Sequence, residues 1–435
     1  MTFPPLVASP GHGSGGRLDS SSRFRSVARE VAGALLAAAL LAVCGNAAAL
    51  AETVPPSTDP ATVQALRDEM AALRRDYEAR LAALEARLAA LESAPAAAAM
   101  PAPVPAAAPA ASGPANYFNP AMAMIANVVG SGGSNPMEDS PSVSLRESEL
   151  SLSAAIDPYA RADFFLGFSE EGVSVEEGYA TFTALPGQWL AKVGRQRVPF
   201  GKVNTLHSHA LSWVDAPLPM QSLVGGEEGW KDDGVTLSRL IPLGDTFSEL
   251  SVSLLRGRAE GLFAAERKRD LASNVHFRLF RDLSDASNVD LGLSWARGAN
   301  GSATGFDTTL AGVDVSWRWK PLRTATSRSL LVRGELVQSR REQPDGTVRA
   351  TGWYLSGDWQ LARRWTIGGR LESSERALEA SQRDDGAALL LTFRPSEFQL
   401  LRAELRRRRY AEEITADELF VQMQFLIGAH GAHAF

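Results

Sequence analysis

The residues with the clearest potential for metal chemistry are two histidine pairs. His207 and His209 are separated by one residue and stand close to Asp215, whereas His430 and His433 lie three positions apart near the C-terminus. A histidine pair with a nearby carboxylate can bind zinc or another divalent metal. Neither pair comes with an identifiable full set of ligands. We therefore favour a structural role for these histidines, with a metal site as the open alternative.

Enzymatic chemistry has little support in the sequence. No nucleophile elbow or similar catalytic motif surrounds any serine, so we predict neither a catalytic residue nor a cofactor. The single cysteine, Cys44, excludes an internal disulfide and a cysteine-based metal site. The formal charge of −6 comes from 44 basic and 50 acidic side chains, with the arginines scattered along the chain. This distribution is not typical of a nucleic-acid-binding protein.

The first histidine pair belongs to a long polar connection at about residues 196–232. It is too long for a simple turn, and its apolar residues Leu211, Trp213, Val214 and Leu218 need a surface to pack on. We predict that it folds into the interior of the surrounding structure and constricts a pore. The predicted constriction residues are Lys202, His207, His209, Asp215, Glu227, Glu228, Asp232 and Asp233.

Segments with a period of two surround this connection. In residues 289–295, for example, apolar side chains alternate with Asp, Gly and Ser, which is typical of a strand between two different environments. The predicted strands are 116–129, 143–156, 159–168, 173–184, 187–195, 233–241, 247–256, 273–283, 286–296, 309–320, 328–339, 350–361, 364–374, 386–394, 397–408 and 417–427. The fold class is therefore all-β, with about sixteen antiparallel strands.

The connections between these strands alternate in length. Tight turns such as IDPY, LARR and RPSE alternate with mostly long polar loops such as GSGGSNPMEDSPS, SRREQPDGTVR and SSERALEASQRDD, and SEEG is a short exception. This layout is typical of a transmembrane β-barrel in an outer membrane, with the long loops outside the cell. A soluble β-sandwich is the alternative, but its dry core could not hold the charged residues that alternate with the apolar ones. The predicted pore-lining bases are Arg278, Arg318, Arg333, Arg370, Arg394 and Arg402.

The residues before the barrel divide into three further parts. Residues 1–51 contain basic residues, an apolar run and Ala49-Leu50-Ala51, as expected for a signal peptide, with a membrane anchor as the alternative. Residues 52–93 contain a heptad seam with one stutter, which predicts a periplasmic coiled-coil stalk or else a helix packed on the barrel. Residues 94–115 form an Ala/Pro-rich linker, and residues 116–435 form the barrel.

Several segments also carry a family resemblance. FNPAMAM, VEEGYATFTALPGQWLAKVGR, HSHALSWVDAPLP and GAHGAHAF resemble a poorly characterised group of proteobacterial outer-membrane barrels, often labelled porins or TonB-dependent receptors. The overall plan resembles Gram-negative trimeric porins, including phosphate-selective and coiled-coil-bearing porins. A TonB-dependent receptor needs about 22 strands plus a plug, for which this chain is too short. The resemblance implies a homotrimer and makes Phe435 a signal for the barrel-assembly machinery.

The expected function is passive diffusion of small hydrophilic solutes or ions through the outer membrane of a Gram-negative bacterium. The expected partners are other copies of the chain, outer-membrane lipid and lipopolysaccharide, the assembly machinery and the solutes, with no nucleic acid. The alternatives are a barrel that binds a ligand or divalent metal, and a stalked tether to the cell wall. We further predict that acids on the 196–232 connection face the arginine wall across the pore, unless those arginines pair with adjacent acids such as Glu335, Glu372 and Glu404.

Overall fold

The computed structural model describes residues 120–138, 140–146, 148–170 and 172–428. The predicted signal peptide, stalk and linker lie outside the described residues, as do His430, His433 and Phe435. None of the helices in the described part of the chain is long and apolar enough to cross a membrane.

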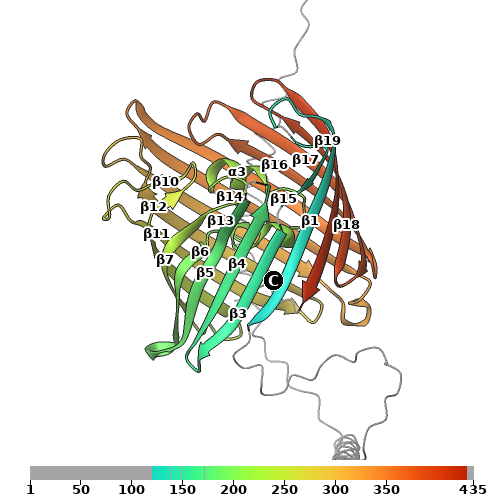
Figure 1. The fold of residues 1–435 in the computed structure, drawn as a ribbon, viewed down its shortest axis with the longest axis horizontal. Coiled ribbons are helices and arrows are strands. Elements are labelled where there is room, and N and C mark those ends of the chain that lie inside the picture. The colour runs from blue at the N-terminus through green and yellow to red at the C-terminus, as the bar shows by residue number, and fades with distance from the viewer. Residues whose placement is uncertain (1–119, 139, 147, 171, 429–435) are drawn as a thin grey trace, which may run out of the picture. The chain divides into compact units, whose positions relative to one another are not determined.

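The described chain forms one closed antiparallel β-barrel (Figure 1). The sheet has 17 strand segments. Two of them, β2 and β3, pair with β1 one after the other and together form a single interrupted strand, so the barrel is sixteen-stranded. Pairing of β1 with β19 closes the ring. The strands are β1 (Ala121–Ser134), β2 (Val143–Leu145), β3 (Ser148–Asp157), β4 (Ala160–Ser169), β5 (Gly172–Leu185), β6 (Trp189–Arg197), β7 (Lys231–Leu240), β8 (Phe247–Leu255), β11 (Ala272–Ser284), β12 (Ser287–Ala299), β13 (Asp307–Trp319), β14 (Ser329–Gln343), β15 (Gly346–Ala362), β16 (Trp365–Glu375), β17 (Arg383–Ser396), β18 (Gln399–Arg409) and β19 (Thr415–Gly428).

The predicted all-β fold and the predicted number of sixteen strands are confirmed, with the first strand beginning at Ala121 in the described residues. Successive side chains of a strand point to opposite faces, so the period of two separates an apolar outer face from a polar inner face. Leu293, Leu371, Leu389 and Leu405 lie on the outer face and are 55–65% exposed. The cross-strand neighbours Asp314 and Glu335 lie on the inner face and are buried. This arrangement is the reverse of that in a soluble domain.

Connection length distinguishes the two ends of the barrel, here named the short-turn end and the long-loop end. One predicted long loop, SRREQPDGTVR, is wrong. Its residues instead continue β14 and β15, which remain paired up to Gln343 and Gly346. The turn residues Pro344-Asp345-Gly346 close a tight hairpin there, with Gly346 at a φ of 142° that favours glycine. This hairpin therefore extends the barrel wall beyond the predicted strand ends.

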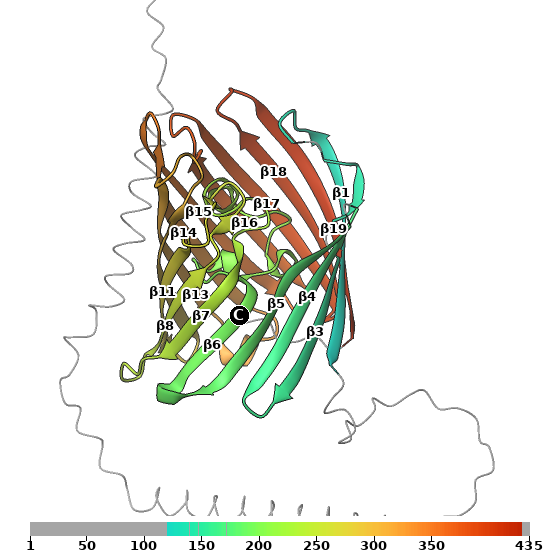
Figure 2. The same ribbon diagram turned by 60° about the vertical axis from the view of Figure 1, so that its left-hand side comes forward.

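The long connection between β6 and β7, residues 198–230, is named the inner loop. It contains the short 3-10 helices η3 (Val203–Thr205) and η4 (Ser208–Ala210) and one short α-helix, α3 (Leu218–Leu223). Figures 1 and 2 show α3 inside the ring of strands from two directions. The remaining short elements are η2 (Pro186–Gln188), η5 (Leu322–Thr324) and the hairpin of β9 (Arg258–Ala259) with β10 (Phe263–Ala264).

Candidate functional site

The inner loop has its own apolar core inside the barrel. Phe200, Trp213 and Trp230 are fully buried, and they belong to one cluster with inward residues of the wall such as Leu310 and Leu390. A long polar connection could not pack in this way on the outside of the barrel. The prediction that this segment folds inward on its apolar residues agrees with the structure.

One buried carboxylate joins the inner loop to the strands at the end of the chain. Asp215 Oδ1 accepts a hydrogen bond from Arg370 Nη2 at 2.7 Å, and Asp215 Oδ2 accepts one from Arg406 Nη1 at 2.6 Å. Arg408 also donates to Asp215. Burial alone would raise the pKa of Asp215, but the three guanidinium groups hold it well below its usual range.

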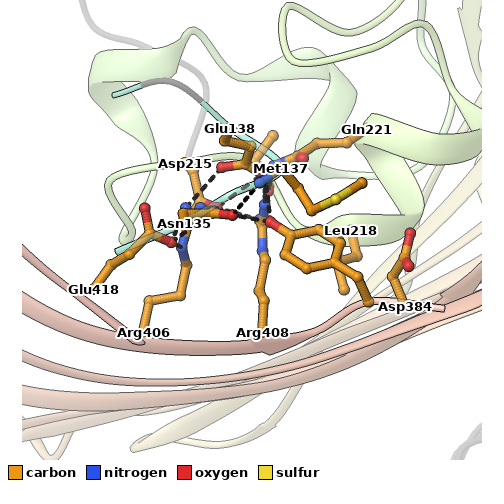
Figure 3. A network of polar contacts seen from close by, with 12 residues as sticks. Asn135, Met137, Glu138, Asp215, Leu218, Gln221, Asp384, Arg406, Arg408 and Glu418 are labelled. Atoms are coloured by element: carbon orange, nitrogen blue, oxygen red, sulfur yellow. Dashed lines mark hydrogen bonds and ion pairs between the residues drawn. The ribbon is translucent and has the colours of Figure 1, made fainter. Parts of the chain in front are cut away.

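The connection between β1 and β2 extends the same network (Figure 3). Glu138 Oε2 accepts from Arg406 at 2.8 Å and Glu138 Oε1 accepts from Arg408 at 2.5 Å. Figure 3 shows both arginines reaching from β18 toward Glu138 and Asp215. Glu418 on β19 also accepts from Arg406, at 2.6 Å. Two arginines of one strand thus connect the inner loop to a second loop at the long-loop end.

Inward carboxylates of the wall also accept main-chain N–H groups of the inner loop. Glu335 Oε1 accepts from Val203 N at 2.7 Å, and Glu404 Oε2 accepts from Val214 N at 2.8 Å. Glu372 Oε2 accepts from Leu218 N at 2.9 Å. An irregular segment leaves its backbone groups without strand partners, and buried groups of this kind need a hydrogen bond. These acids therefore position the loop.

The arginines of this wall pack against the same segment. Arg402 donates to the carbonyl oxygens of Trp213 and Leu211, each at 3.0 Å. The guanidinium carbons of Arg333 and Arg370 lie 4.9 and 5.2 Å from the Trp213 ring centroid. Both distances are within the range of about 6 Å for a cation–π interaction. The wall from β14 to β18 thus contacts the inner loop through charge, main chain and aromatic surface together.

The opposite wall holds the loop mainly through one histidine. His207 is 4% exposed, with its Nδ1 2.6 Å from Glu149 Oε2 on β3 and its Nε2 2.8 Å from Glu177 Oε1 on β5. Only a doubly protonated imidazole can donate to both carboxylates. Burial would lower the pKa of His207, but the two glutamates raise it to about 8. His207 is therefore a cationic link between loop and wall.

The other groups around His207 are few. The His209 ring stacks on it at 5.5 Å, with His209 Nδ1 3.7 Å from Glu149 Oε2. Phe165 of β4 lies 4.8 Å from the His207 ring, and Arg197 donates its main-chain N–H to Glu177 at 2.8 Å. The described residues contain no group of three or more His, Cys, Asp or Glu side chains that could hold a metal ion. Both ring nitrogens of His207 face carboxylates, which supports the structural role.

The remaining predicted residues are dispersed. Lys202 Nζ lies 3.5 Å from Asp290, which also accepts from Arg278 at 2.8 and 2.6 Å. Glu228 pairs with Lys231, and Arg333 lies 3.1 Å from Asp358. Arg318, Arg394 and Glu227 lie on the inner side of the barrel or on the inner loop without belonging to these networks. Arg278 and Arg333 thus form ion pairs with acids of the adjacent strands. Such pairing was the predicted alternative to a wall of unpaired arginines.

The predicted placement of Asp232 and Asp233 opposite an arginine wall is wrong. Asp232 points inward but is buried, where it accepts the main-chain N–H groups of Gly257 at 2.8 Å and Arg258 at 3.1 Å. Asp233 follows it on a strand and therefore points outward. It lies 3.1 Å from Arg195 of the neighbouring strand β6 and 3.2 Å from Arg256, which directly follows β8.

A cavity of about 420 Å³ lies between the inner loop and the wall of β1–β5. Arg146, Glu176, Arg197 and Glu227 line it, together with Ser144. Arg146 donates to Val214 O of the inner loop at 3.0 Å, which brings a further base to this space. Glu138 and Asp215 of the arginine network also line this cavity, so it extends from the β1–β5 wall to the edge of that network.

Sequence reasoning missed Glu138, Arg146 and Glu177 as site residues. Glu176 and Glu177 are consecutive yet both buried, because a register shift between Phe165 and Leu166 places an extra residue in β5. A bulge of this kind turns two neighbouring side chains to one face and breaks the period of two. The adjacent acids Glu176-Glu177 in an otherwise alternating strand were the available signal.

Comparison with known proteins identifies sequences and structures that are similar to this chain. No family model matches the chain. An uncharacterized protein from Aquifex aeolicus is 29% identical over 332 residues, covering 67% of this chain and 70% of that protein. An anion-selective porin from Comamonas acidovorans is similar in structure, with a TM-score of 0.50, 12% identity and coverage of 71% of this chain and 99% of that chain. The high-pH structure of Pseudomonas putida OprB has a TM-score of 0.51, 10% identity and coverage of 72% and 95%.

The fold is that of an outer-membrane porin. At these identities the likeness concerns the barrel and not the transported solute. The part of the expected family resemblance that holds is therefore the general porin architecture.

Proposed function

We propose that this protein is an outer-membrane channel for passive diffusion of small hydrophilic solutes or ions, narrowed by the inner loop, and that it is not an enzyme. The observation that supports this most is the reversed polarity of the barrel, with exposed leucines outside and charged side chains inside. Such a barrel suits a lipid exterior and an aqueous interior. The inner loop, fixed on both walls, supplies the constriction.

The solute path in this proposal runs through the cavity between the inner loop and the β1–β5 wall. Lys202, His207, His209, Asp215, Glu227 and Glu228 border or fix the constriction, and Arg278, Arg318, Arg333, Arg370, Arg394 and Arg402 belong to the inner wall. Of these, Asp215 and Arg370 hold the loop in place, and Glu227 faces the cavity. Together with Arg146, which also lines the cavity, Glu227 influences solute preference.

Recording from planar bilayers tests the channel. The purified full-length protein should insert in discrete conducting steps. In a Cys44→Ser background, a bulky thiol reagent should reduce the conductance of Ser144→Cys, which lines the cavity. Ser273→Cys is the matched control, because Ser273 pairs with the outward Leu254. A protein that inserts without conducting would favour a tether, and equal effects of the reagent on both variants would move the path elsewhere.

We also propose the finer assembly expected from the sequence, a homotrimer with a periplasmic stalk at residues 52–93. Deleting 52–93 should weaken the oligomer without unfolding the barrel, as measured by native mass spectrometry in mild detergent. A protein that stays monomeric with the stalk intact would contradict the proposed trimer.

A further inference from the structure

A second pocket of about 510 Å³ lies on the outer side of the barrel, above β7 and β8 at the long-loop end. We name it the rim pocket, lined chiefly by Leu254, Arg256, Arg258, Arg267, Lys268 and Leu271. No residue of the inner loop lines it, and the side chain of Leu254 points outward in the same row as Val252, although the inward Leu255 closes its base.

The floor of the rim pocket continues the apolar outer face. Leu254 is 54% exposed and Leu271 is 45% exposed. Next to Leu254 on the barrel, Val235 is its cross-strand partner on β7 and is also exposed. If the outer face lies in a lipid bilayer, this floor is therefore open to acyl chains.

The side of the pocket away from the apolar face is basic. Its lining contains four bases, Arg256, Arg258, Arg267 and Lys268, against the two acids Asp233 and Glu266. Asp233 is shared between Arg256 and a further arginine, Arg195, so one carboxylate serves two guanidinium groups. A net positive charge therefore remains at the boundary of the apolar surface.

The segment that carries these bases is built into the fold. Asp232 fixes the main chain of Gly257 and Arg258, and Gly257 O accepts from Ala265 N at 2.8 Å. Gly257 has a φ of 81°, and a Cβ there would lie 2.8 Å from Asp270 O. Asp270 in turn accepts the main-chain N–H of Arg267 at 3.0 Å. The basic side chains thus extend from an ordered backbone.

We propose that the rim pocket binds a phosphorylated lipid headgroup of the outer leaflet, with acyl chains along Leu254 and Leu271. The inference rests on the proposed outer-membrane location. Guanidinium groups bind phosphate oxygens through paired, charge-assisted hydrogen bonds, and the adjacent leucines suit the hydrocarbon part of the same molecule. The pocket therefore couples two surfaces that a lipid, unlike a soluble anion, can occupy at once.

The test uses the full-length protein in detergent and native mass spectrometry with added diphosphorylated lipid A. The triple variant Arg256→Gln, Arg258→Gln, Lys268→Gln should bind the lipid about tenfold more weakly or worse, because it loses charge-assisted hydrogen bonds. The matched control is Arg340→Gln with Arg349→Gln, two exposed arginines paired across β14 and β15 at the same end of the barrel. This control should bind the lipid like the wild type.

Three outcomes would overturn the proposal. The first is an equal loss of binding in the control, which would indicate non-specific attraction to any basic rim. The second is unchanged binding of dephosphorylated lipid A, and the third is competition by inorganic phosphate at the lipid's own concentration. Retained heat-modifiable migration on gels verifies that each variant is folded. Conductance should be the same in the triple variant, so a failure of the channel proposal and a failure of this one are distinguishable.

Discussion

The two walls that hold the inner loop differ in how they hold it. The β14–β18 wall uses three arginines on Asp215, three carboxylates on main-chain N–H groups and the packing around Trp213. The β3–β5 wall uses chiefly His207 between Glu149 and Glu177, supplemented by Arg146. The arginines of the first set stay charged throughout the physiological pH range, because guanidinium groups do not lose their protons there. The second depends on a titratable group.

This difference indicates which contact would yield first. Displacing the loop from the β14–β18 wall leaves several buried charges without partners, which is costly. Displacing it from the β3–β5 wall breaks one histidine-centred link next to an existing cavity. If solute passage requires the loop to move, we expect movement at the β3–β5 side while the arginine wall remains the fixed point.

The largest effect should follow from Asp215→Asn. The substitution leaves Arg370, Arg406 and Arg408 buried with less compensating charge, and breaking a buried pair costs about 3–5 kcal/mol. We expect a clear fall in the melting temperature of the barrel in detergent and faster proteolytic cleavage within residues 198–230. Asp417→Asn is the matched control, since Asp417 pairs with Arg407 on the exposed outer face. Equal melting temperatures for the two variants would show that Asp215 contributes little to the stability of the contact between the inner loop and the β14–β18 wall.

A smaller loss of stability but a larger change in conductance should follow from His207→Gln. Glutamine can still donate to one carboxylate but carries no charge for the other. The β3–β5 contact should weaken while the arginine wall keeps the loop in the barrel. Single-channel recording should give a higher mean conductance or more frequent openings than in the wild type. If His207→Gln instead behaves like Asp215→Asn in proteolysis, the two walls are not distinct.

The wild-type link should also depend on pH. The pKa of His207, raised to about 8 in the folded protein, lies above the ordinary value of 6.5. A raised histidine pKa means that the stabilisation is fully present below about pH 6.5 and is lost as the pH rises through about 8. Conductance should therefore increase between pH 7 and pH 9. The increase should be absent in His207→Gln and retained in His209→Gln, because His209 Nδ1 lies 3.7 Å from Glu149. If the conductance of the wild type does not change between pH 7 and pH 9, the contact of the inner loop with the β3–β5 wall does not depend on the protonation of His207.

The barrel could be predicted because alternation is a local property of each strand. The inner loop could be predicted from its length and from apolar residues such as Trp213. The identity of its anchors could not, since Asp215 meets Arg406 across 191 residues and Glu138 meets Arg408 across 270. Long-range pairings of this kind depend on strand register, which one bulge can change. The bulge in β5 is why Glu177 was missed.

The smallest effect should come from Asp233→Asn, a residue next to the inner loop but outside both walls. Asp233 lies on the outer face between Arg195 and Arg256, so its charge should be screened from the pore interior by the barrel wall. We expect no shift of the reversal potential in a salt gradient. Arg146→Gln should shift it toward cations, because Arg146 lines the cavity on the β1–β5 side. A shift for Asp233→Asn comparable to that for Arg146→Gln would mean that solutes pass close to the rim of β7, and the path would then not be defined by the two walls of the inner loop.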